Sequence, residues 1–143
     1  EWFASVSKKL SSSMAEPKPE DFEDYEDGFD NNCSIVTKVT HGENVFLFAA
    51  DAMQERLEEI MDIGTCDLLK EPYHGREIAN LGEFLDAVKP TYAVISTSQD
   101  ELASSTLEAL SERKIVTYAT CLHGTVTAVS DGKTLTVTSA GLE

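Results

Sequence analysis

Two residues of metal-binding types follow two apolar segments of the chain. Asp51 comes directly after the apolar segment 45–50, and His74 follows the short segment 67–70 across Pro72. Strand ends in α/β folds are where chemistry usually sits, because loops there project side chains from a rigid sheet. If the two segments are adjacent strands, their ends bring a carboxylate and an imidazole together. We therefore expect Asp51 and His74 to share a metal ion.

Other catalytic groupings in the sequence are weaker. The serine-containing stretches 96–98 and 104–105 have no histidine or acid at a spacing that indicates a Ser-His-Asp triad. His123 lies two residues after Cys121, an arrangement more typical of neighbours at a strand end than of a Cys-His dyad. No Gly-rich phosphate loop occurs, and the basic residues are scattered, so no nucleic-acid patch is predicted.

Composition bounds the size and the partners of the protein. The chain has 143 residues, of which 41% are hydrophobic, enough for one domain with a core of its own. The formal net charge is −15, and residues 16–30 hold eight acids against the single base Lys18. Such a run repels phosphate and is typical of a solvated linker. Direct nucleic-acid binding is therefore not expected.

The cysteines and the apolar runs bear on the cellular compartment. Cys33, Cys66 and Cys121 are widely spaced and form no Cys-x-x-Cys pair, which argues against a zinc knuckle or a disulfide framework. Cys66 lies in an apolar context typical of a small buried hydrophobe. No apolar run approaches the roughly 18 residues that span a bilayer. We expect a reducing, cytoplasmic compartment and no membrane segment within this chain.

Hydrophobic periodicity predicts an α/β fold. A hairpin is expected from β-branched residues 33–40 returning through 45–50, the latter apolar enough to be buried on both faces. Further strands are expected at 67–70, 92–96 and 115–118, and a closing hairpin at 125–129 and 134–138. Helices are expected at 52–61, 81–88 and 100–113, with Asp100 as an N-cap. This order predicts a mixed β-sheet with helices on one face and terminal hairpins.

The same patterns divide the chain into parts. Residues 1–15 are predicted to form an amphipathic helix, residues 16–30 an acidic linker, and residues 31–140 the folded domain. The final residues 141–143 are interpreted as the scar of an affinity tag, because a Leu-Glu ending is common at such junctions. The helix carries its apolar residues at helical spacing and needs a partner surface; they are Trp2, Phe3, Val6, Leu10 and Met14.

Several short motifs resemble one protein family in their order and spacing. They are Asn-Asn-Cys-Ser-Ile-Val at 31–36, Phe-Leu-Phe-Ala-Ala-Asp at 46–51, Asp-Leu-Leu-Lys at 67–70 before Tyr-His-Gly at 73–75, Val-Lys-Pro at 88–90 before 93–96, and 116–120 before 124–126. Together they resemble the second half of a metallo-β-lactamase-fold domain, in the hydrolase-like branch of ComEC-type competence proteins. The resemblance covers about residues 31–139.

The resemblance implies half of an αββα sandwich and a metal pair, zinc or manganese, that activates water for hydrolysis. Asp51 falls where the family has its strand-end metal-bridging Asp, and His74 falls in its His-His-Gly element. Tyr73 replaces the first His of that element, and Ala50 replaces the Gly before the Asp. The His-x-His-x-Asp-His element that supplies most of the family's ligands is absent from this sequence. We therefore expect this chain to be inactive alone.

Three interpretations follow. The chain is part of a larger metal-dependent hydrolase-like protein whose other ligands precede Glu1, or a degenerate module with a structural or protein-interaction role. Alternatively it is an unrelated α/β binding domain in which Asp51 is the N-cap of the helix that follows. The expected partner is the missing N-terminal half of the domain or a second copy. An uncovered apolar sheet face would be covered by a second copy or by the helix 2–14.

Overall fold

Residues 29–141 are described by the computed structural model, so the amphipathic segment 1–15 and most of the acidic linker lie outside the described residues. The helices are α2 (Phe29–Asn32), α3 (Gln54–Glu59), the 3₁₀ turn η2 (Pro72–Gly75), α4 (Leu81–Val88), α5 (Ser104–Glu112) and α6 (Thr120–His123). The strands are β1 (Thr37–His41), β2 (Asn44–Phe48), β3 (Leu68–Lys70), β4 (Tyr92–Ile95), β5 (Val116–Ala119), β6 (Val126–Ser130) and β7 (Leu135–Ser139).

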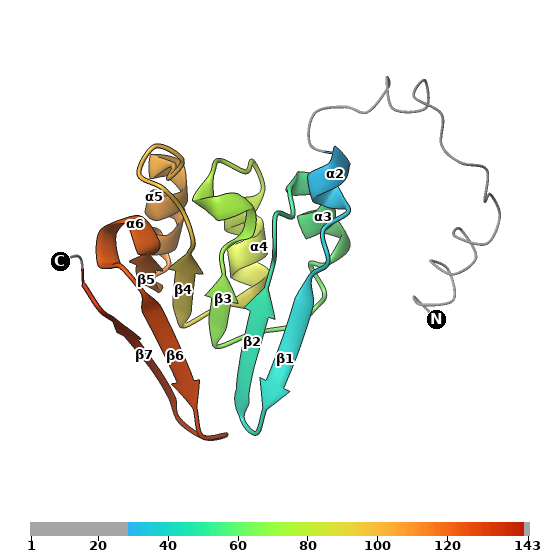
Figure 1. Cartoon of the computed structure of the whole chain (residues 1–143). Coiled ribbons are helices and arrows are strands. Elements are labelled where there is room, and N and C mark those ends of the chain that lie inside the picture. The colour runs from blue at the N-terminus through green and yellow to red at the C-terminus, as the bar shows by residue number, and fades with distance from the viewer. Residues whose placement is uncertain (1–28, 142–143) are drawn as a thin grey trace, which may run out of the picture.

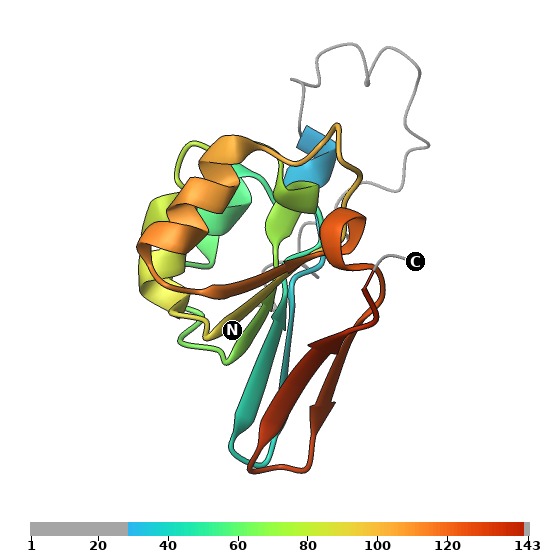
Figure 2. The same cartoon turned by 90° about the vertical axis from the view of Figure 1, so that its left-hand side faces the viewer.

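Five strands form one mixed sheet in the order β1-β2-β3-β4-β5. The pair β1–β2 is antiparallel and the other pairs are parallel, while β6 and β7 form a separate antiparallel sheet. The helices α3, α4 and α5 lie on one face of the main sheet (Figures 1 and 2). The predicted α/β class, with a mixed sheet, helices on one face and terminal hairpins, is confirmed.

The core lies between the main sheet and these helices. Strand alternation directs Leu47, Leu69 and Ile95 toward the helix layer, where they are fully buried with Phe84 and Leu110. Their burial removes large apolar side chains from water, which is the main stabilising term for a domain of this size. The core therefore holds the strand ends, and the loops that follow them, in fixed positions.

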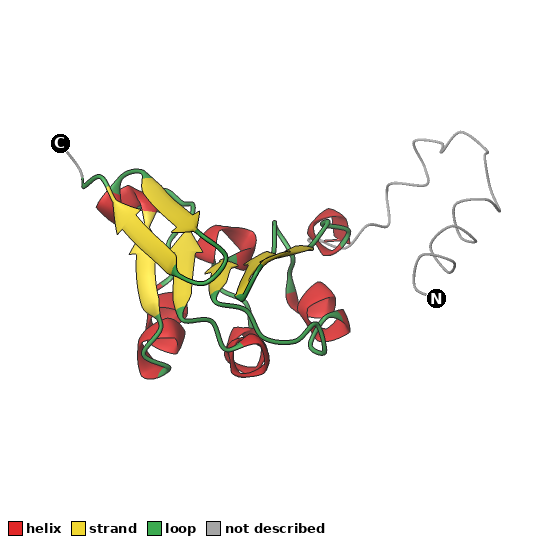
Figure 3. Cartoon of the chain, turned by 90° about the horizontal axis from the view of Figure 1, so that it is seen from below, coloured by secondary structure: helices red, strands yellow, loops and turns green. Residues whose placement is uncertain are grey.

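The other face of the main sheet carries two rows of side chains, which we call the open face. Strand register places five side chains in each row: Thr37, Phe48, Lys70, Val94 and Tyr118 in one, and Val39, Phe46, Leu68, Tyr92 and Val116 in the other. The β6–β7 hairpin covers part of it, and Tyr118 Oη donates to the carbonyl of Val137 at 3.4 Å (Figure 3 shows the hairpin beside the sheet).

The open face overturns one prediction. Segment 45–50 was expected to be buried on both faces, yet Phe48 is 43% exposed. Helices α3, α4 and α5 all lie on the opposite face of the sheet in Figure 2, so side chains that alternate away from the core on β2 are not covered by them. Val39 is also 43% exposed, and Ile35 just before β1 is 82% exposed. The apolar residues of β2 thus lie in two different environments: Leu47 is buried in the core, whereas Phe48 is partly exposed on the open face.

The closing hairpin is attached to the first one at the turns. Ser130 Oγ donates to Asn44 Oδ1 at 2.7 Å, and the Glu43 N–H donates to the carbonyl of Gly132 at 2.7 Å. A Cβ atom at Gly42, whose φ is +60°, would lie 2.1 Å from the Gly132 carbonyl oxygen, so only glycine fits there. These contacts fix the hairpin across the open face.

Two predicted helix starts are wrong. Helix α3 begins at Gln54 with Met53 as its N-cap, so Asp51 is not the cap that the third interpretation required. Helix α5 begins at Ser104 with Ala103 as its N-cap, and Asp100 is not a cap. The Ala103 N–H instead donates to the carbonyl of Gly75 at 3.0 Å. The residues before α5 are therefore tied to the loop that carries His74.

Among the described residues, no helix is long and apolar enough to cross a membrane.

Candidate metal site at the strand ends

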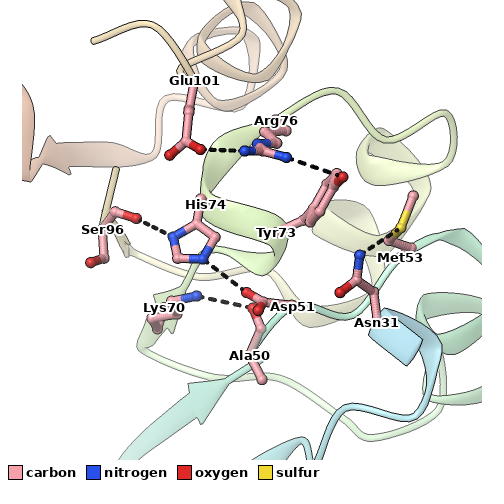
Figure 4. Close-up of polar contacts among 10 residues, drawn as sticks. All are labelled: Asn31, Ala50, Asp51, Met53, Lys70, Tyr73, His74, Arg76, Ser96 and Glu101. Atoms are coloured by element: carbon pink, nitrogen blue, oxygen red, sulfur yellow. Dashed lines mark hydrogen bonds and ion pairs between the residues drawn. The ribbon is translucent and has the colours of Figure 1, made fainter. Parts of the chain in front are cut away.

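The structure brings Asp51 and His74 together. Strands β2 and β3 are parallel neighbours, so their carboxyl ends lie at one edge of the sheet. Asp51 follows β2, and His74 lies in η2, directly after β3. Nε2 of His74 is 3.1 Å from Oδ1 of Asp51 (Figure 4). The side chains are 42% and 45% exposed, so the pair is open to solvent. Their predicted proximity is confirmed, and their role as metal ligands stays a prediction.

The other ring nitrogen of His74 determines what Nε2 can do. Nδ1 lies 2.7 Å from the backbone carbonyl oxygen of Ser96, which only accepts hydrogen bonds. Nδ1 must therefore carry a proton. In the neutral imidazole, Nε2 then carries a lone pair that points toward a carboxylate oxygen of Asp51. Two acceptors at this distance require a cation between them: a proton on Nε2, which makes an ion pair, or a metal ion bound by both.

The loop that carries His74 has an unusual backbone. Tyr73, His74 and Gly75 have φ values of 45°, 56° and 73°, all in the left-handed region. Such a conformation is unfavourable for the two residues with side chains, and strain of this kind is found most often at functional sites. Hydrogen bonds hold it in place: the Tyr73 N–H donates to the carbonyl of Ala50 at 3.2 Å, and the Arg76 N–H donates to that of Tyr73 at 3.0 Å.

A second contact from the loop reaches the segment before α5. Arg76 forms an ion pair with Glu101, donates to Tyr73 Oη at 3.3 Å, and places its guanidinium carbon 5.1 Å from the centroid of the Tyr73 ring. The hydrogen bond from Arg76 lowers the pKa of Glu101. Figure 4 shows these residues on the side of the loop away from Asp51. The loop is therefore held on one side by the contacts of His74 and on the other by the ion pair of Arg76 with Glu101.

Lys70 places a positive charge at the same edge. Its Nζ donates to the carbonyl of Ala50 at 2.9 Å (Figure 4). Burial lowers the pKa of Lys70, and the charge of Asp51 acts in the opposite direction. The ammonium therefore shares the field of the Asp51 carboxylate with any other cation bound there. Lys70 was part of the motif read from the sequence, but its contact with Ala50 depends on the fold.

Glu71 is a buried carboxyl group directly before this loop. It is fully buried, and neither carboxyl oxygen has a hydrogen-bond partner in the described part of the chain. Burial raises its pKa to about 8, while Lys70 acts in the opposite direction. The group is therefore held protonated at neutral pH. Nothing in the sequence indicates that this glutamate is buried.

The remaining candidates do not extend the site. Within residues 29–141, no group of three or more His, Cys, Asp or Glu side chains could hold a metal ion. Cys66 is buried, and burial raises the pKa of its thiol to about 12, as expected for a small buried hydrophobe. His123 contacts the backbone of Ala119 through Nδ1, and His41 lies near Ser130 at the far end of the sheet. Asp51 and His74 are thus two candidate ligands, and the described residues supply no third beside them.

Comparisons with models of protein families and with curated proteins find no match to this chain. The class of protein that the fold and the site define is an α/β domain with an acid–imidazole pair at the carboxyl ends of adjacent parallel strands. Its function is therefore inferred from the geometry of that pair.

Proposed function

We propose that this chain is part of a metallo-β-lactamase-like domain and belongs to a larger metal-dependent hydrolase-like protein. In this proposal Asp51 and His74 supply part of the ligand set for a zinc or manganese ion. The observation that supports it is the 3.1 Å approach of His74 Nε2 to Asp51 Oδ1, with the opposite ring nitrogen bonded to the Ser96 carbonyl. When bound, such a metal acts as a Lewis acid and activates water for hydrolysis.

The donor set fits a metal ion in type and orientation. Imidazole nitrogen and carboxylate oxygen are both zinc ligands, and a ligating His usually donates its other N–H to a carbonyl or carboxylate. Ser96 supplies that carbonyl. The strained loop of residues 73–75 holds the ring in this orientation, while β2 holds Asp51. The protein's own contribution is thus an oriented lone pair beside a carboxylate.

The set is incomplete, so we propose that the chain is inactive alone. A catalytic zinc site needs about three protein ligands, and the described residues offer two at this position. The missing ligands would come from the other half of the domain or from a second copy. The exposed part of the open face at Val39 and Phe48, which the β6–β7 hairpin leaves uncovered, supports this, because an αββα sandwich has a second sheet packed on that side.

A degenerate, non-catalytic module is the second candidate. One observation favours it: His74 Nε2 lies within ion-pair distance of Asp51 Oδ1, and the ammonium of Lys70 acts on the same carboxylate. The negative charge of Asp51 can therefore be balanced by a proton on His74 and by the ammonium of Lys70, without any metal ion. In that case the strand-end pair stabilises the loop, and the domain serves as a structural or interaction unit.

Zinc titration by calorimetry tests the first proposal against the second. The matched variants are Asp51→Asn, His74→Gln and the control His41→Gln, which changes an exposed histidine far from the pair. The proposal predicts weak zinc binding that falls by roughly 10- to 100-fold in the first two variants and is unchanged in the control. Equal zinc affinity in all four proteins, or no binding by the unmodified chain, would contradict it. A melting temperature that falls in Asp51→Asn without zinc binding would support the degenerate module.

A further inference from the structure

A threonine hydroxyl on α6 holds the peptide group that contacts His74. The Ser96 carbonyl and the Thr97 N–H belong to one peptide group, which is planar and trans, so they point in opposite directions. The carbonyl oxygen lies 2.7 Å from His74 Nδ1 (Figure 4), and the N–H donates to Thr120 Oγ1 at 3.0 Å. The two ends of this peptide group are therefore held by side chains from η2 and from α6.

Strand pairing brings Thr120 to this position. Strands β4 and β5 are parallel, and Ile95 is in register with Ala119 at their carboxyl ends. The residues that follow the two strands therefore meet at the same edge of the sheet as the candidate site. Thr120 is the first residue of α6, and the N–H of Gly124 donates to its carbonyl at 3.0 Å, which closes this short turn. The fold thus fixes the hydroxyl independently of His74.

The Thr120 hydroxyl binds both backbone groups of Thr97. Oγ1 accepts from the Thr97 N–H and donates its own proton to the Thr97 carbonyl at 3.1 Å. Both threonines are half-buried, so turning the peptide group over would leave backbone groups without partners. Hydrogen bonds in a chain also polarise one another, so donation by the N–H makes the Ser96 carbonyl a stronger acceptor.

The orientation of this peptide group decides where the neutral ring of His74 carries its proton. With the carbonyl toward the ring, the proton is on Nδ1 and the lone pair is on Nε2. The Asp51 carboxylate that faces Nε2 is partly exposed, so water can satisfy it when the ring is neutral. With the peptide group turned over, its N–H would face the ring. Nδ1 would then accept, and the proton would be on Nε2, bonded to Asp51.

We propose that Thr120 is a positioning residue for His74. Through the peptide group between Ser96 and Thr97, its hydroxyl keeps the proton of the neutral ring on Nδ1 and leaves the Nε2 lone pair available to a metal ion. Because the effect passes through the hydroxyl, it depends on that group and not on the size of the side chain. The consequence for zinc rests on the proposed function, whereas the effect on the ring does not require a metal ion.

Nitrogen-15 NMR of the zinc-free chain, at a pH where the ring is neutral, reports which imidazole nitrogen carries the proton. His74→Gln assigns the signals. Thr120→Val removes the hydroxyl at nearly constant shape, and Thr120→Ser keeps it. The control is Thr117→Val, which removes a hydroxyl on β5 that donates to the Ile115 carbonyl at 3.1 Å. We expect the Nδ1–H form in the original chain, in Thr120→Ser and in Thr117→Val. In Thr120→Val the population of the Nε2–H form should rise severalfold.

Three outcomes would overturn the proposal: the Nε2–H form in the original chain, an unchanged form in Thr120→Val, or a change in Thr120→Ser as large as in Thr120→Val. Circular dichroism checks that each variant is folded. Thr120→Ala, which removes the same hydroxyl, takes the place of Thr120→Val if the larger side chain prevents folding.

Zinc titration of the same proteins separates this inference from the proposed function. If both hold, zinc affinity falls by roughly 10-fold in Thr120→Val and recovers in Thr120→Ser. A tautomer change in Thr120→Val, in a chain that binds no zinc, supports the positioning role and contradicts the proposed function. Zinc bound equally by the original chain and Thr120→Val, with no tautomer change, overturns the positioning role alone.

Discussion

The Nδ1 atom of His74 lies 2.7 Å from the carbonyl oxygen of Ser96, and this contact fixes the tautomer of the ring. Because a carbonyl can only accept, a proton is on Nδ1, and Nε2 faces Asp51 either with a proton of its own or with a lone pair that a metal ion can use. The strand β4 that ends just before Ser96 thus orients a side chain that follows β3. An acid and a histidine that merely lay close would not have this property. The orientation is what makes the pair a candidate ligand set.

Gly75→Ala should displace the loop that carries His74. Gly75 has φ of +73°, and a Cβ atom there would lie 2.6 Å from Cγ2 of Ile95 in the core. We expect a loss of about 2–5 kcal/mol in the free energy of unfolding, from backbone strain and overpacking together. Denaturant unfolding measures it. Gly141→Ala is the control, because it shares a positive φ of +77° but has no atom within 4 Å of the added Cβ. Equal losses in both variants would show that Ile95 does not restrict the loop.

Glu71 should make stability depend on pH. Its pKa is raised from 4.5 to about 8 by burial, so the folded protein holds a proton that the unfolded chain releases. The stabilisation from this proton is fully present below pH 4.5 and is lost as pH rises toward 8. Between these values the free energy of unfolding should fall by about 1.4 kcal/mol per pH unit, several kcal/mol in total.

The variant Glu71→Gln isolates this effect, because its amide does not titrate. The difference in unfolding free energy between the original chain and this variant should change steadily from pH 4.5 to 8 and then level off. Glu71→Leu should be more stable than the original chain at pH 9, because it removes a buried polar group without a partner. A constant difference across the pH range would mean that Glu71 reaches water or a partner in solution.

Arg76→Gln should loosen the same loop without unfolding the domain. The substitution removes the ion pair with Glu101 and the contact with the Tyr73 ring, both of which hold the left-handed turn. Hydrogen exchange of the amides at 73–76 should become severalfold faster. Arg113→Gln serves as the control, since Arg113 pairs with Asp86 at 2.7 and 2.9 Å on the helix layer. Equal protection of these amides in both variants would contradict a role for Arg76 in holding the turn.

Much of the fold could be predicted because local patterns and tertiary structure agree. The Asp-Gly turn and the alternation around it predicted the closing hairpin, and the periodic stripe at 81–88 predicted α4. The helix starts at 52 and 100 were wrong because tertiary hydrogen bonds override local capping preferences. The N–H of Met53 donates to Oδ1 of Asn32 at 3.2 Å, and the N–H of Ala103 donates to the carbonyl of Gly75 at 3.0 Å. Such bonds leave no local signal.

The candidate site was predictable only in part. Asp51 and His74 could be named from their positions after apolar segments, because parallel strands end at one edge. Ser96 could not, since its contribution is a backbone carbonyl that any residue would supply. The ion pair of Arg76 with Glu101 joins residues 25 positions apart in the sequence. The burial of Glu71 depends on the packing of the helix layer against the sheet. These features appear only when the chain is folded.

Anomalous diffraction at the zinc edge, from crystals of the chain soaked in zinc, tests the central claim most directly. The proposal predicts a peak within about 2.0–2.2 Å of both His74 Nε2 and an Asp51 carboxylate oxygen, with the Ser96 contact retained. The same soak of Asp51→Asn should show no peak at that position. A zinc peak elsewhere in the original chain, with none between these two side chains, would contradict the claim that Asp51 and His74 are metal ligands.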